Sequence, residues 1–243
     1  MTGDATVDGP ARHVPSSRLH HAIIRTLVDT GAPPTTHEMA AQLGVDHADV
    51  VEGMHALAAQ HGVVLHPHRP EVWVAHPFAT APTVFTVRHR ERTWWGNCAW
   101  CSLGVAALVG PGSDADPITI TTVLGGEDRQ VTLRVVGDRL LDGDYVVHFP
   151  VPMRHAWDNV LYTCSVMLLF ASSDEVDRWC RRHHIARGDV RDVDVVWRFA
   201  RAWYGRHLDA DWRKWTTDEA AALCARFGLD GDIWRLSAGT DRF

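Results

Sequence analysis

The stretch that decides the fold is "TWWGNCAWCSLGVAALVG", residues 93–110. Alternating side chains over residues 84–89 predict a strand just before it. Asn97 is a good helix N-cap, and the mostly apolar residues after it end at the "GPG" of residues 110–112. The stretch therefore predicts a strand that leads into a helix beginning at Asn97.

Two cysteines lie at the start of this predicted helix. Cys98 and Cys101 are three residues apart, so they share one helix face. Free N–H groups and the helix dipole stabilise a thiolate in the first turn, and we expect Cys101 to be more acidic than a free cysteine. A cysteine pair of this kind occurs in structural metal sites, in redox pairs and in soft-metal catalytic sites.

The rest of the sequence bears differently on these three uses. A structural zinc site needs four ligands, and the sequence has no second Cys-x-x-Cys. A thioredoxin-like redox pair requires a βαβ setting, whereas a hairpin is predicted after the cysteines. A soft-metal site would combine Cys101 with a distant cysteine. Cys164 is the best candidate, although its apolar surroundings also suit an inert core residue.

The N-terminal part has the pattern of a winged-helix module. After a predicted disordered tail (1–16), helical spacing, caps and turn residues indicate three helices and two short strands over residues 17–80. The helix that would enter a DNA groove carries Asp46, Asp49 and Glu52 and no Lys or Arg, so it would repel phosphates. We therefore expect no nucleic-acid partner.

The remaining sequence predicts an α+β fold. Residues 81–208 indicate a mixed domain with a mainly antiparallel sheet flanked by helices, including a hairpin that turns at Gly125 and Gly126. The apolar run 160–172, which contains Cys164, fits either a strand or a buried helix. Residues 209–243 are expected to form a C-terminal helical extension.

Composition limits the classes of function. The 243 residues are 46% hydrophobic and 22% charged, with a net charge of -6, so no overall field attracts nucleic acid or anionic lipid. The sequence shows neither a secretory signal at its start nor a membrane-spanning apolar run. Five scattered cysteines indicate reduced thiols in the cytoplasm. No glycine-rich phosphate loop occurs, so we expect no organic cofactor.

Two segments together resemble the active-site segments of the alkylmercury (organomercurial) lyases. These are "TWWGNCAWCSLGVAALVG" and "TCSVMLLFAS", residues 163–172. The resemblance implies that Cys101 and Cys164 are the catalytic cysteines, and that the N-terminal module does not read DNA. It further implies that two thiolates bind the mercury of R–Hg⁺ and that an acid protonates the departing carbon. Hg(II) would remain as the bound product, with free thiols as its acceptor.

The sequence departs from the family pattern at two positions. The resemblance implies an aspartate three residues after the first catalytic cysteine, and Gly104 stands there. A neighbouring family cysteine is replaced by Ser165. Gly104 can neither move a proton nor hold a metal, and we expect the missing side chain to leave room for a larger or less charged ligand.

Several residues could substitute for that aspartate. Cys98 could donate a proton or act as a third sulfur ligand, and Ser102, Ser165 and Asp158 could also approach. Two other hypotheses stay open beside a divergent lyase: a thiol-based metal-binding or sensing protein without turnover, and a lyase-fold protein recruited to other small-metabolite chemistry. In each case the expected partner is a small molecule. The histidines at 183–184 and in "HPHRP" (66–70) are expected to be surface residues.

Overall fold

The computed structural model describes residues 14–236. Most of the predicted N-terminal tail, residues 1–13, lies outside this range, as do residues 237–243 of the predicted extension. Val14 is buried and the first helix begins at Ser16, so residues 14–16 of the predicted tail belong to the described fold. Within the described range, no helix has the length and apolar character needed to cross a membrane.

The N-terminal part contains the three helices and two strands expected from the sequence. They are α1 (Ser16–Thr30), α2 (Thr36–Leu43), α3 (His47–Ala59), β1 (Val64–Leu65) and β2 (Val72–Ala75). Thr35 caps α2 and forms a capping box with Glu38. The two strands are not a separate wing, because β2 pairs with β3 (Phe78–Ala79) and β3 pairs with β5 (Arg92–Gly96). The main sheet therefore runs across the boundary predicted at residues 80 and 81.

Two antiparallel sheets form the rest of the framework. The larger has eight strands in the order β1-β2-β3-β5-β4-β6-β7-β8, and the smaller has the order β10-β9-β11. The α+β class with a mainly antiparallel sheet is thus confirmed. The remaining strands and helices are β4 (Thr86–His89), α4 (Ala99–Leu108), β6 (Ile118–Val123), β7 (Gln130–Val136), β8 (Arg139–Leu140), β9 (Val146–Phe149), α5 (Val160–Val166), β10 (Leu169–Phe170), α6 (Ser173–His183), β11 (Asp189–Asp192), α7 (Val193–Tyr204) and α8 (Thr217–Arg226).

The structure defines one ambiguous segment and one short strand that no sequence pattern indicated. The apolar run 160–172 forms helix α5 and then the short strand β10. Helix α7 begins at Val193, because residues 189–192 pair with β9 as strand β11. Asp189 and its neighbours therefore extend the smaller sheet before the chain enters α7.

The turn from β5 into α4 is unusually tight. A Cβ atom at Gly96 would lie 2.5 Å from the Cα of Ser102, so this close approach requires glycine. The N-cap of α4 is Cys98 rather than the predicted Asn97, and its Sγ accepts the backbone N–H of Cys101 at 3.2 Å. The sulfur thus takes the place that an oxygen usually occupies at a helix N-cap.

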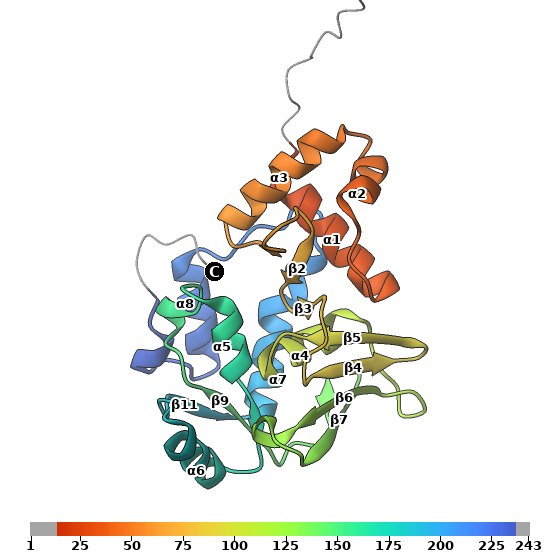
Figure 1. Cartoon of the computed structure of the whole chain (residues 1–243). Coiled ribbons are helices and arrows are strands. Elements are labelled where there is room, and N and C mark those ends of the chain that lie inside the picture. Colours follow the sequence, from red (N-terminus) through yellow and green to blue (C-terminus); the bar gives the residue numbers. More distant parts are fainter. Residues whose placement is uncertain (1–13, 237–243) are drawn as a thin grey trace, which may run out of the picture.

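Helix α4 is the central element of the molecule. It lies between the larger sheet and α7, and α7 in turn packs on β9 and β11 of the smaller sheet (Figure 1). Trp100 on α4 stacks on Phe199 of α7, with ring centroids 5.0 Å apart. Because the N-terminal end of α4 faces both α5 and the end of α7, side chains from these three helices meet at one place.

Candidate functional site

Three ligand-type side chains converge at the N-terminal end of α4. Cys101 comes from the first turn of α4, Cys164 from α5, and His76 from the turn between β2 and β3. The two Sγ atoms and a ring nitrogen of His76 all lie within 4.8 Å of one another. Both thiols are buried, with 1% and 5% of their surface exposed, and both are free. The cysteine pair predicted from the sequence is therefore brought together, with an imidazole beside it.

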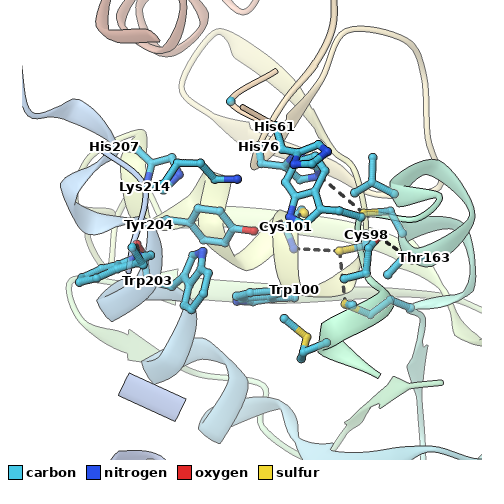
Figure 2. A pocket seen from close by; sticks show the side chains of 18 of the residues that line it. His61, His76, Cys98, Trp100, Cys101, Thr163, Trp203, Tyr204, His207 and Lys214 are labelled. Carbon is cyan, nitrogen blue, oxygen red and sulfur yellow. Dashed lines mark hydrogen bonds between the residues drawn. The ribbon is translucent and has the colours of Figure 1, made fainter. Parts of the chain in front are cut away.

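Each of the two sulfurs has its own polar neighbour; Figure 2 labels Cys101 with its neighbour Tyr204, and also His76. The Sγ of Cys164 lies 3.7 Å from Nε2 of His76, and the amide Nδ2 of Asn97 lies 3.4 Å from the same nitrogen. The Sγ of Cys101 lies 3.6 Å from the hydroxyl of Tyr204, the last residue of α7. An amide nitrogen only donates, so Nε2 of His76 is an acceptor that can also take the Cys164 proton.

The electrostatics of the site shift the pKa values of the two cysteines in opposite directions. Burial alone would raise the pKa of Cys101, but hydrogen bonds from Cys164 and Cys98 outweigh it, and the pKa falls well below its usual range. The pKa of Cys164 is raised well above its usual range, first because it donates to Cys101. Cys101 is thus the more acidic of the two thiols, which agrees with the acidity expected for Cys101 at a helix N-terminus.

Cys98 has a supporting place in this cluster. Its sulfur accepts the Cys101 N–H and lies 3.5 Å from the Sδ of Met167. Burial raises its pKa well above the usual range, so it stays a neutral thiol. The third ligand-type side chain beside Cys101 and Cys164 is His76, whereas the sequence suggested Cys98 for that role.

The other proposed substitutes for the missing carboxylate are bonded to groups other than the Cys101 and Cys164 sulfurs. Ser102 is buried but donates to the Ala99 carbonyl, and Ser165 is exposed and donates to the Tyr162 carbonyl. Asp158 is exposed and pairs with Nδ1 of His155 at 2.8 Å. None of the three is among the residues that line the pocket described below.

The space beside Gly104 is filled by Tyr204. A Cβ atom at position 104 would lie 2.3 Å from Cδ2 and 2.6 Å from Cε2 of the tyrosine ring. The expectation that Gly104 leaves room for a larger ligand is therefore wrong. The glycine lets α7 approach α4 closely enough for the phenol to reach Cys101.

The sulfurs open into a pocket with aromatic walls. Its volume, including the open mouth, is about 750 Å³. The aromatic side chains that line it are Trp100, Trp157, Trp203, Tyr204, Trp212 and Trp215. Trp212, Lys214 and Trp215 belong to the segment after residue 208, so the C-terminal extension supplies one wall of the pocket. The Nζ of Lys214 lies 4.9 Å from the ring centroid of Trp157.

Sequence reasoning missed His76, Tyr204 and most of the aromatic wall. His76 has no metal-ligand spacing around it, and Tyr204 reads as one more apolar position of an amphipathic helix. Only the folded arrangement aligns them with Cys101. A usable sequence signal for Tyr204 was the glycine at 104, since a glycine inside a buried helix often marks a close packing contact.

The fold and the site together define an α+β protein with a buried cysteine pair and an imidazole at the base of an aromatic pocket. A family model described as alkylmercury lyase (MerB) matches residues 78–205, more than half of the chain. The chain therefore belongs to the alkylmercury lyase family.

The fold is also found among solved structures. One described as the mercury-bound form of MerB2 matches with a TM-score of 0.61 and 18% sequence identity, covering 81% of this chain and 94% of that one. At this identity the likeness supports the fold alone. A comparison with curated proteins found no match.

Proposed function

We propose that the protein is an organomercurial lyase-like enzyme that cleaves a carbon–mercury bond by protonation. The observation that carries this proposal is the meeting of Cys101 and Cys164, distant in sequence, within 4.8 Å at the base of a pocket. Two thiolates at this separation suit a soft, thiophilic metal such as mercury. Membership of the alkylmercury lyase family supports the same reaction.

The two cysteines would act in order. Cys101 is the more acidic thiol, so its sulfur displaces the ligand X from R–Hg–X and forms a Cys101–Hg–R adduct. Cys164 then loses its thiol proton, which Nε2 of His76 is placed to accept, and binds the same mercury. When the Hg–C bond breaks, its electron pair stays with carbon, which takes up a proton and leaves as R–H. Mercury stays Hg(II) throughout.

The surroundings of the sulfurs favour a particular substrate class. The organic group R would lie against the tryptophan walls, so we expect apolar and aromatic groups to bind better than methyl. Two free thiols would then exchange with the cysteines and remove Hg(II). The proposal therefore includes a small-molecule substrate and a reducing compartment such as the cytoplasm.

The test is release of benzene from phenylmercury acetate in the presence of excess thiol, followed by gas chromatography. We expect benzene from the wild type and none above background from Cys101→Ala or Cys164→Ala. Cys180→Ala is the matched control, because Cys180 is a buried cysteine on α6 whose sulfur faces His148 instead of the pocket. Equal benzene release from the wild type and Cys101→Ala would refute the proposal.

A second candidate function is thiol-based binding or sensing of a soft metal without turnover. The observation that favours it is His76, because two thiolates and an imidazole also suit Zn(II) or Cu(I). Stoichiometric uptake of Hg(II), Zn(II) or Cu(I) that depends on Cys101, Cys164 and His76, without any benzene release, would favour this function over the lyase.

A further inference from the structure

The phenol of Tyr204 is placed at the one sulfur that would carry the organomercury adduct. Its hydroxyl lies 3.6 Å from the Sγ of Cys101, and the residue is only 2% exposed. Figure 2 shows the hydroxyl pointing from the end of α7 toward Cys101. A group bound on that sulfur would come within reach of the hydroxyl proton.

The backbone around Tyr204 is shaped to hold the ring there. Position 104 lies on α4, one turn after Cys101, and the tyrosine ring is so close that even a Cβ atom at 104 would overlap it. The ring also packs against Trp100, with centroids 5.4 Å apart, and against His207 at 5.1 Å. Contacts from α4 and from the turn after α7 therefore fix the direction of the hydroxyl.

We propose that Tyr204 is a catalytic residue whose hydroxyl donates the proton that cleaves the carbon–mercury bond. This inference rests on the proposed lyase function. In the step, the O–H bond of Tyr204 breaks and a C–H bond forms with the electron pair of the Hg–C bond. The phenolate then takes up the proton that Cys164 releases on binding mercury. Overall, R–Hg–X, one thiolate and one thiol give R–H, X⁻ and a dithiolate-bound Hg(II), and no atom changes its oxidation state.

The neighbouring groups fit other roles. Nε2 of His76 faces the Cys164 sulfur, where it can accept the thiol proton. The Cys98 sulfur is engaged at the helix N-cap and beside Met167. Tyr204 contacts the Cys101 sulfur through its hydroxyl group, at 3.6 Å.

The experiment compares single-turnover benzene release from phenylmercury by the wild type, Tyr204→Phe, Tyr162→Phe and Cys101→Ala. Tyr204→Phe keeps the ring over Gly104 and removes only the hydroxyl. Tyr162 is the control phenol, because it lies on α5 near Cys164 in sequence but is 49% exposed. Native mass spectrometry of each reaction then reports whether the bound species is phenylmercury or mercury alone.

We expect Tyr204→Phe to release benzene at least about a hundredfold more slowly, the usual minimum effect of a general acid. It should accumulate the phenylmercury adduct at full stoichiometry, with Tyr162→Phe behaving as the wild type. Benzene release by Tyr204→Phe at the wild-type rate would overturn the inference and leave the lyase function intact. A slower rate caused by weaker phenylmercury binding would also overturn it, because the hydroxyl would then only position Cys101. A wild type that releases no more benzene than Cys101→Ala would reject the lyase function and this inference with it.

Discussion

The contact between Gly104 and Tyr204 predicts a strong coupling between two positions that no sequence motif links. Gly104→Ala would place a Cβ atom 2.3 Å from Cδ2 and 2.6 Å from Cε2 of Tyr204, and 2.9 Å from the Cβ of Pro77. These distances are far below van der Waals contact, so the tyrosine ring must move. Overpacking of this kind costs about 1–3 kcal/mol of stability.

The size of the effect follows from two opposing contributions. The tyrosine is buried between two helices and has little freedom to yield, so we take the upper end, about 3 kcal/mol. Alanine is favoured over glycine inside a helix by about 1 kcal/mol. The net loss for Gly104→Ala is therefore about 2 kcal/mol, which lowers the melting temperature by about 4–8 °C in a chain of this length.

The assay is a double-mutant cycle measured by urea unfolding of the wild type, Gly104→Ala, Tyr204→Ala and the double variant. Without the tyrosine ring only the milder contact with Pro77 remains, so Gly104→Ala should be close to neutral and the coupling energy should reach about 2 kcal/mol. Gly205→Ala is the control, because a Cβ atom there has no neighbour within 4 Å. The reasoning is refuted if Gly104→Ala costs the same with and without the tyrosine, or if it costs nothing in the wild type.

Three further predictions concern other parts of the site. Burial lowers the pKa of His207 to about 3, so below pH 6.5 the unfolded chain binds a proton that the folded protein does not, and stability falls as the pH drops. His207 alone should cost about 2 kcal/mol of stability at pH 5. Urea unfolding at pH 7 and pH 5 should therefore show a smaller loss of stability in His207→Gln than in the wild type. An equal loss in that variant would contradict this origin. Cys98→Ser should retain the helix cap and near wild-type stability, whereas Cys98→Ala should lose about 1 kcal/mol in the same assay; similar values for the two would argue against the cap. Trp215→Ala should raise KM for phenylmercury more than for methylmercury, and parallel changes for both would exclude a role for this wall in selecting the organic group.

The sequence predicted the parts of the fold that depend on local patterns. Caps, turn glycines and alternating strands were sufficient for the α+β class, for the hairpin β6–β7 and for most helices. The N-cap of α4 was misplaced by one residue, because the preference for asparagine competes there with a cysteine sulfur that reaches the same N–H group. Strand β11 was not predicted, since pairing of residues 189–192 with β9 depends on a strand far away in the sequence.

The candidate site was predictable only where a motif carried it. Cys101 and Cys164 were identified through two short segments, and both lie at the pocket. His76 and Tyr204 carry no such signal, because each is placed by a contact between elements: His76 by the turn that joins β2 to β3, and Tyr204 by the packing of α7 on α4. Removing a side chain at 104 looked like a loss of function, but the partner that occupies the vacated volume could be seen only in three dimensions.

The close approach of α4 and α7 has a consequence for how such proteins evolve. Where two helices touch at a single small residue, the small volume beside that residue can be filled by a side chain from either helix. A reactive function can then migrate from one segment to another while the reaction centre stays fixed. Relatives that lack the acidic residue at this position are therefore better compared by the side chain that fills the volume between the two helices than by the residue at the aligned position.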